Sequence, residues 1–298
     1  MKLDATSSLS FLDNDPRYQH EKPYEIIAGM APSGWKSNCK FTTVPGLLIR
    51  DCRHFRNQLT IDTCGFEYHD WDCTSNLQYD IFESADGGDL STLIEPYLLE
   101  TIARVRERFH AEKVVCFDWR LRSRMSKLAD QPEPTLDKVR DHAVEVAQIV
   151  HYDNSQSEGN WLFGRCMSPS EKAQYLSPGW RVRIVNVWRP INNVVLDCPL
   201  TFCHPRSVKP ENIVPVDKVH KDHVSEGCYL SHDSSQEWFY MSRQTRNEAA
   251  LFMTWDSNGT IEHGMIPPHG AFLHQNIPDG VEPRASVEVR LFVVTRET

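Results

Sequence analysis

The chain has 298 residues, of which 40% are hydrophobic and 24% are charged, and its formal net charge is −9. A chain of this length and composition buries a sizeable core without disulfides or a structural metal. The acidic balance argues against a nucleic-acid-binding protein. No apolar stretch approaches the roughly 20 residues that a membrane-spanning helix needs.

The start of the chain and its cysteines indicate the compartment. Residues 1–15 carry early aspartates and no apolar core, so they are not a secretory signal. The nine cysteines include no C-x-x-C pair, which argues against a zinc ribbon and a disulfide framework. We therefore expect a cytoplasmic protein, without nucleic acid or a membrane as a partner. A homodimer is compatible with this composition.

The chain is predicted to begin with an irregular arm over residues 1–40, followed by a single domain over residues 41–298. A capping box and an apolar stripe predict a helix from about Thr92 to His110. A second capping box, with proline at the first helical position, predicts a short helix from Pro169 to about Leu176. Short apolar or alternating segments predict strands within residues 44–63 (two strands), 114–117, 144–150, 181–188, 237–241, 249–255 and 287–294.

Many short strands with Pro- and Gly-containing turns, after one long helix, predict a mainly β fold with supporting helices, a β-barrel or jelly roll. Residues 130–134, Asp-Gln-Pro-Glu-Pro, form the best linker candidate. The segment is short, and we do not divide the chain there.

Metal-ligand spacing gives the first indication of chemistry. A non-haem Fe(II) oxygenase uses two histidines and one carboxylate on one face of the metal, which leaves positions open for oxygen and a co-substrate. The first two ligands are commonly spaced His-x-Asp/Glu, because residues i and i+2 of a strand point to the same side. This triplet occurs three times here, about as often as chance allows, so its context must decide.

Two of the three triplets differ clearly in context. His110 and Glu112 end a predicted helix, where positions i and i+2 are about 200° apart and cannot share a metal. His151 and Asp153 follow an apolar predicted strand and continue its inward face. We therefore predict His151 and Asp153 as the first two metal ligands.

The third triplet, His220 and Asp222, lies in a polar run typical of a solvated loop. It stays open as a rival metal pair, in which His220 and Asp222 would act with His269 in place of His151 and Asp153.

The second histidine must come from a distant strand. His269 stands at the start of a predicted strand, 118 residues after His151, and Arg284 and Ser286 follow it just before the last predicted strand. A guanidinium holds a carboxylate with two parallel hydrogen bonds, and a serine hydroxyl adds a third. This order predicts His269 as the third metal ligand, and Arg284 and Ser286 as the site for the distal carboxylate of 2-oxoglutarate.

The chain resembles a fungal family of Fe(II)/2-oxoglutarate-dependent hydroxylases and desaturases of secondary metabolism, over about residues 45–295. Asn186-Val-Trp-Arg-Pro190 and Arg284-x-Ser286 are the most specific blocks. Further matching blocks are Asp51-x-Arg53, Thr60-x-Asp62-x-x-Gly65-Phe66, Val115-x-Phe117-Asp118-x-Arg120-x-Arg122, His151-Tyr-Asp153-Asn-Ser, Trp238-x-Tyr240-Met241, Asp256-Ser257, Pro268-His269-x-Ala271-Phe272 and Arg284-x-Ser286-Val-Glu288-x-Arg290.

The resemblance implies a double-stranded β-helix, the cupin-like jelly roll, with Fe(II) as cofactor and 2-oxoglutarate and O2 as co-substrates. It also implies Arg189 as a second anchor for an anion, although a salt bridge at the end of its strand explains Arg189 equally well. Arg120 and Arg122 are candidates for binding an acidic substrate, and a solvated basic edge is the competing interpretation. Tyr152 and His204 depart from the family pattern, so substrate identity is not transferred.

The expected reaction oxidises an unactivated C–H bond of a small carboxylate- or amino-acid-like secondary metabolite. Hydroxylation, desaturation and oxidative ring closure, such as aziridine formation, are all compatible with the site. Two other classes stay open: a metal-dependent enzyme of the same fold that does not use 2-oxoglutarate, and a non-catalytic binding module.

Overall fold

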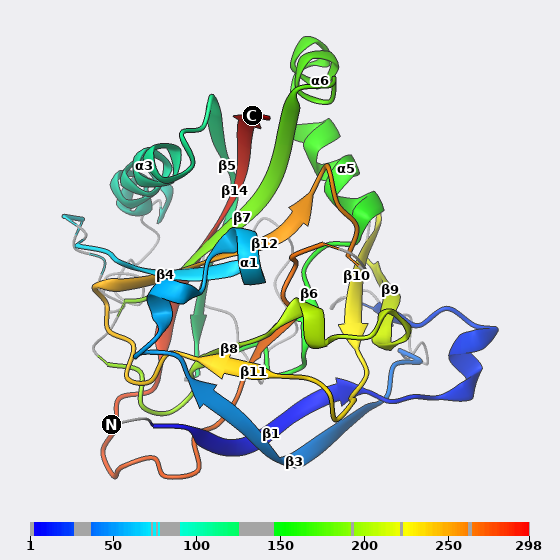
Figure 1. Ribbon diagram of the computed structural model, residues 1–298, viewed down its shortest axis with the longest axis vertical. Helices are drawn as coiled ribbons and strands as arrows, with labels where there is room; N and C mark the ends of the chain where they lie inside the picture. The colour runs from blue at the N-terminus through cyan, green and yellow to red at the C-terminus, as the bar shows by residue number, and fades with distance from the viewer. Residues whose placement is uncertain are drawn as a thin grey trace.

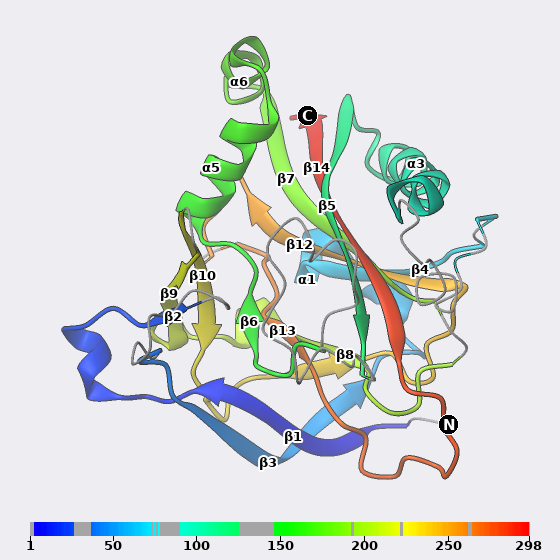
Figure 2. The same ribbon diagram turned by 180° about the vertical axis from the view of Figure 1, so that it is seen from behind.

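The computed structural model consists of two β-sheets that curl toward each other, with helices at the periphery (Figures 1 and 2). Within the described part of the chain, no helix combines the length and apolar character needed to cross a membrane. The described residues are 3–26, 37–72, 74, 75, 77, 90–124, 146–191, 194–220, 223–261 and 264–297.

The smaller sheet has five antiparallel strands, and its three inner strands are almost wholly buried. β7 and β14 pair over eleven positions, from Ser286 opposite Pro190 to Arg296 opposite Trp180. In spatial order the strands are β4 (Phe66–Asp70), β12 (Glu248–Asp256), β7 (Trp180–Pro190), β14 (Ala285–Arg296) and β5 (Lys113–Ser123).

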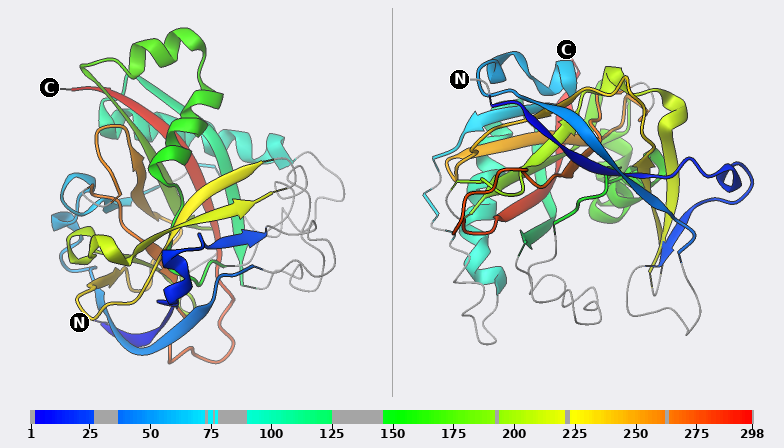
Figure 3. Two further views of the ribbon diagram at one scale, coloured as in Figure 1. Left: turned by 90° about the vertical axis from the view of Figure 1, so that its right-hand side faces the viewer. Right: turned by 90° about the horizontal axis from the view of Figure 1, so that it is seen from below.

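The larger sheet has nine strands, most of them short and antiparallel. β3 pairs with β11, and β2 with β9, in parallel. Figure 3 shows the β1–β3 pair of this sheet, in blue, in a different layer from β14, in red. In spatial order the strands are β1 (Ala5–Leu12), β3 (Phe41–Asp51), β11 (Trp238–Tyr240), β8 (Leu200–Cys203), β13 (His269–Ala271), β6 (His151–Tyr152), β10 (Val224–Leu230), β9 (Ile213–Val219) and β2 (Tyr24–Ile26).

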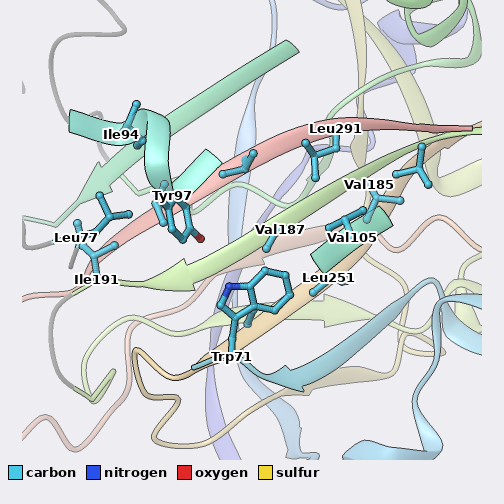
Figure 4. Packing of buried hydrophobic residues seen from close by; sticks show 14 of the residues in the cluster. Trp71, Leu77, Ile94, Tyr97, Val105, Val185, Val187, Ile191, Leu251 and Leu291 are labelled. Carbon is cyan, nitrogen blue, oxygen red and sulfur yellow. The ribbon is translucent and has the colours of Figure 1, made fainter. Parts of the chain in front are cut away.

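Helix α3 (Leu90–Phe109) covers the outer face of the smaller sheet. Figure 4 shows Ile94 and Tyr97 of α3 packed with Val187 of β7 and Leu291 of β14. Successive strand residues point to opposite faces. The odd-numbered residues of β14 from Val287 to Val293 therefore lie in this apolar cluster, and the intervening polar ones face the larger sheet.

The remaining helices are short, and their ends carry the expected capping groups. The hydroxyl of Ser155 accepts a hydrogen bond from Glu158 N and begins α5, and Ser168 and Glu171 form a capping box at α6. The helices are α1 (Ile61–Cys64), α5 (Gln156–Cys166) and α6 (Pro169–Tyr175), with 3-10 turns η1 (Pro16–Gln19), η2 (Arg56–Gln58), η4 (Pro205–Ser207) and η5 (Pro210–Asn212).

The mainly β jelly-roll fold predicted from the sequence is confirmed, as are the helices near 92–110 and 169–176 and the strands near 114–117, 181–188, 237–241, 249–255 and 287–294. Three local predictions differ from the structure. The arm expected to be irregular contains β1 and β2, and only one strand, β3, lies within residues 44–63, where α1 replaces the second. In residues 146–150 the structure has a single bridge, from Ile149 to Ser10, and not a strand.

These differences have physical reasons. β1 reads ATSSLSFL, in which small polar residues dilute the alternation, although Leu9 and Phe11 are buried. Thr60 and Thr63 cap each other across the first turn of α1, so the side chains satisfy backbone groups that a strand would otherwise pair. The linker candidate at 130–134 lies outside the described residues.

Gly65 ends α1 beside the segment that leads to β13. Its φ is +78°, and a Cβ there would lie 1.9 Å from the carbonyl oxygen of Met265. Gly46 in β3 has a similar φ of +74°, but nothing lies within 4 Å of the equivalent position. Substitutions at Gly46 and Gly65 therefore separate the cost of backbone strain from the cost of a steric clash.

We expect Gly46→Ala to lower the free energy of unfolding by about 1 kcal/mol, the cost of a left-handed alanine. Gly65→Ala should cost about 1–3 kcal/mol more, because Met265 and Pro267 must also move. Denaturant unfolding of both variants measures the two values. Equal losses would mean that the loop before β13 yields without cost.

Candidate metal centre

Three potential ligands converge where β6 and β13 meet. His151 pairs with His269 in the larger sheet, and their ring centres lie 4.6 Å apart. Asp153 follows β6, with Oδ1 3.7 Å from Nε2 of His151 and Oδ2 3.8 Å from Nε2 of His269. One ligand atom from each residue lies within 4.8 Å of the other two, so a single ion can contact all three.

The hydrogen bonds of both imidazoles favour metal binding. Nδ1 of His151 lies 2.8 Å from the carbonyl oxygen of Ile149, and Nδ1 of His269 lies 3.3 Å from that of Pro267. A carbonyl only accepts, so each Nδ1 carries the proton, and each Nε2 lone pair points at the third ligand. Two neutral imidazoles and one carboxylate form the donor set of non-haem Fe(II) sites.

Burial and neighbouring charge keep these groups in ligand form. Burial, and then the adjacent His269, lower the pKa of His151 to about 3, so the ring is neutral at pH 7. Burial raises the pKa of Asp153, but Arg290 and the two imidazoles outweigh this effect and hold it well below its usual range. The carboxylate is therefore ionised.

Asp153 is held by side chains from the smaller sheet. Asn186 of β7 donates from Nδ2 to Oδ2 of Asp153 over 2.7 Å and to Glu288 over 3.2 Å. Arg290 of β14 donates to Oδ1 of Asp153 over 3.1 Å and to Glu288 over 2.9 Å.

Sequence reasoning gave Asn186 and Arg290 no role. Both were in matching blocks, and their inward parity on β7 and β14 was the signal that could have revealed them.

Arg284 and Ser286 lie on the same inward face of the β14 segment. Arg284 is 2% exposed, its guanidinium stacks 5.2 Å from the ring of Trp188, and Nη1 donates to the carbonyl oxygen of Cys198. Burial, above all, lowers the pKa of Arg284. Nε of Arg284 and Oγ of Ser286 are buried without a protein partner. Such buried donors fit a carboxylate ligand, because an unsatisfied buried group is costly.

Arg189 does not join this group. Because Trp188 faces the interior, Arg189 points to the opposite face of β7, where its guanidinium lies 4.7 Å from the ring of Tyr97 in α3. It donates to the carbonyl oxygen of Arg246 and is 1% exposed. Arg189 therefore lies on the α3 side of β7, away from the three candidate ligands, and its role as an anion anchor stays a prediction.

The rival metal pair, His220 and Asp222, lies only partly within the described residues. His220 follows β9, stacks 4.3 Å from the ring of His223, and has Nε2 3.0 Å from Oγ of Ser225. Asp222 lies outside the described residues. Among the residues that the structure describes, His151, Asp153 and His269 form the one cluster with metal-binding geometry.

A cavity of about 1180 Å³ opens beside the three ligands. Its walls come from β5, from the β9–β10 hairpin and from α5, and His151, Asp153 and Arg290 also line it. The space accommodates a small organic molecule next to a bound metal.

A curled two-sheet fold that holds two imidazoles and a carboxylate beside a cavity is typical of the jelly-roll metalloproteins. The chain belongs to the family described as Oxidoreductase/YMDC permease-like domain, whose model matches residues 9–294.

Fungal Fe(II)/2-oxoglutarate-dependent dioxygenases are homologues of this chain, so the resemblance drawn from the sequence is confirmed. The Fe(II)/2-oxoglutarate-dependent dioxygenase nvfI of Aspergillus novofumigatus is 25% identical over 290 residues, which cover 96% of this chain and 95% of nvfI. The hydroxylase/desaturase asaB of Aspergillus flavus is 31% identical over 140 residues, covering 43% and 60%. A solved structure of the iron and alpha-ketoglutarate-dependent endoperoxidase NvfI superposes with a TM-score of 0.78 at 24% identity, covering 99% of both chains.

The lowered pKa of His151 predicts a pH dependence of stability in the metal-free protein. Below pH 6.5 the unfolded imidazole binds a proton, which the folded one binds only near pH 3, so stability falls as the pH falls through this window. We expect the free energy of unfolding to drop about 1 kcal/mol more in wild type than in His151→Gln between pH 7.5 and 5.5.

Denaturant unfolding at a series of pH values measures this difference. His20→Gln, at an exposed turn, should keep the wild-type slope. Parallel slopes for wild type and His151→Gln would contradict the lowered pKa.

Proposed function

We propose that the chain is a non-haem Fe(II)/2-oxoglutarate-dependent dioxygenase that oxidises an unactivated C–H bond of a small molecule. The observation that carries the proposal is the convergence of His151, Asp153 and His269, of which His151 and Asp153 line the cavity. The homologous dioxygenases support it.

His151, Asp153 and His269 would hold Fe(II). When bound, the iron with O2 and 2-oxoglutarate supplies the oxidant that removes hydrogen from the substrate, while 2-oxoglutarate is converted to succinate and CO2. The carbonyl partners of the two Nδ1 atoms fix the imidazole tautomers. Asn186 and Arg290 orient the carboxylate and keep it ionised.

Arg284 and Ser286 would bind the distal carboxylate of 2-oxoglutarate. Arg284 is held in place by Trp188 and by the carbonyl of Cys198, so little side-chain freedom is lost on binding. Its buried surroundings exclude water and strengthen a charged hydrogen bond. Whether hydroxylation, desaturation or ring closure follows depends on which C–H bond of the substrate faces the metal.

The direct test is anaerobic addition of Fe(II) and then 2-oxoglutarate, with detection of the weak visible charge-transfer band of the chelate. We expect the band in wild type and none in His269→Ala. Arg284→Met should raise the Kd for 2-oxoglutarate by about 10–100-fold, because a charged hydrogen-bonded contact is lost.

Arg189→Met is the matched control, because Arg189 lies on the far face of β7. It should leave the Kd for 2-oxoglutarate within about twofold. Iron binding without a band would favour a metal enzyme of the same fold that does not use 2-oxoglutarate. Absence of stoichiometric iron would favour a binding module.

Asn186 provides a separate test of the metal site. Asn186→Leu removes the donor shared by Asp153 and Glu288 and leaves two buried carboxylates less well supported. We expect Fe(II) affinity to fall about 10–100-fold, as for other groups that orient metal ligands. Calorimetric Fe(II) titration under anaerobic conditions measures this change.

Asn160→Ala, on the exposed side of α5, should keep wild-type affinity for Fe(II). Unchanged affinity in Asn186→Leu would mean that the metal does not use the carboxylate of Asp153 in its observed orientation.

A further inference from the structure

One guanidinium in the cavity wall has no part in the proposed metal centre. Arg120 lies in the middle of β5, opposite Glu288 of β14, and lines the cavity. Its Nε is 3.0 Å from Oδ2 of Asp118, its side chain is 20% exposed, and its Nη1 is buried without a hydrogen-bond partner. The only ion pair of Arg120 in the described structure therefore leaves part of the guanidinium unused.

The carboxylates near Arg120 are already shared with another cation. Arg290 lies within 4 Å of all three: 3.1 Å from Asp153, 2.9 Å from Glu288 and 3.6 Å from Asp118. Asp118 thus forms ion pairs with both guanidiniums. Glu288 and Asp153 accept hydrogen bonds from Arg290 and Asn186. Binding of Fe(II) and the 2-oxoglutarate dianion adds equal and opposite charges. It therefore brings no further counter-ion to Arg120, whose Nη1 has no hydrogen-bond partner.

Further observations point in the same direction. Burial lowers the pKa of Arg120; Asp118 and Glu288 oppose this effect, and the nearby Arg290 and Arg122 add to it. On the facing wall Lys218 of β9 also lines the cavity, with Nζ 3.9 Å from the nearest carboxylate oxygen, on Glu25. A partly desolvated cavity with cations on two walls favours an anionic occupant.

We propose that the substrate carries a carboxylate and that Arg120 binds it, with the rest of the molecule extending along the cavity toward His151 and Asp153. This inference rests on the proposed function and assigns its substrate class. Arg120 is a specificity-determining residue. It binds the end of the substrate that is remote from the reacting carbon, and so selects which C–H bond lies next to the metal.

The test uses a matched pair of fluorescent probes, 2-naphthoate and its uncharged analogue 2-naphthamide. Both are titrated into protein loaded anaerobically with Fe(II) and saturating 2-oxoglutarate, so that the co-substrate site is already filled. Wild type should bind 2-naphthoate about tenfold or more tightly than 2-naphthamide. Arg120→Gln should bring this ratio close to one through weaker binding of the acid, and Arg120→Lys should keep part of the preference.

Arg165→Gln is the charge-matched control, since Arg165 is an exposed residue of α5 that lines the same cavity. It should keep the wild-type ratio. Thermal unfolding of each variant establishes that it is folded. If Arg120→Gln does not fold, the ratio of the two probe affinities is compared between wild type and Arg120→Lys.

Three results would overturn the proposal: equal affinity of wild type for the two probes, loss of the preference in Arg165→Gln as well, or loss of the 2-oxoglutarate charge-transfer band in Arg120→Gln. The last result would make Arg120 a co-substrate anchor. Failure of the proposed function is distinguishable, because the band would then be absent from wild type. A preference for 2-naphthoate in iron-free wild type that is lost in Arg120→Gln would still support the anion site.

Discussion

The clamp on the Asp153 carboxylate is the interaction on which the site depends. One oxygen accepts a hydrogen bond from Asn186 and the other from Arg290, and both donors come from the sheet opposite the one that carries the imidazoles. The carboxylate therefore joins the two layers of the fold. Isolated from these donors, a carboxylate at this depth would be protonated or would distort the site to reach water. The metal geometry thus depends on the spacing of the two sheets.

Aromatic packing maintains that spacing beside His269. Phe66 of β4 stacks 4.7 Å from Phe202 of β8, Phe202 lies 5.1 Å from Phe252 of β12, and Phe252 lies 4.7 Å from the His269 ring. These rings alternate between the smaller and the larger sheet. They fix His269 from its apolar side, while the Nδ1 hydrogen bond to Pro267 fixes its rotation. Packing and hydrogen bonding therefore orient the same imidazole independently.

Sequence patterns predicted much of the fold, because β7, β12, β14 and α3 are long or strongly patterned. The ligand pair at residues 151 and 153 was selected on an apolar strand that the structure reduces to His151–Tyr152, so part of that argument was wrong. The resemblance implied Arg189 as an anion anchor, whereas strand alternation sends Arg189 to the face of β7 opposite Trp188. Strand parity indicates that Asn186 and Arg290 point inward, but their contact with Asp153 depends on how the two sheets pack, which no local pattern encodes.

The hairpin formed by β9 and β10 has two functionally separate ends. Cys228 and Tyr229 pair with Tyr152 and His151, so this end belongs to the scaffold of the ligand strand. The distal end, with Lys218 opposite Ser225, pairs with β2 and not with the ligand strand, and it borders the cavity. Variation at the distal end can reshape the cavity while the ligand strand keeps its pairing. Natural divergence or directed evolution can therefore alter substrate choice there without rebuilding the oxidation chemistry.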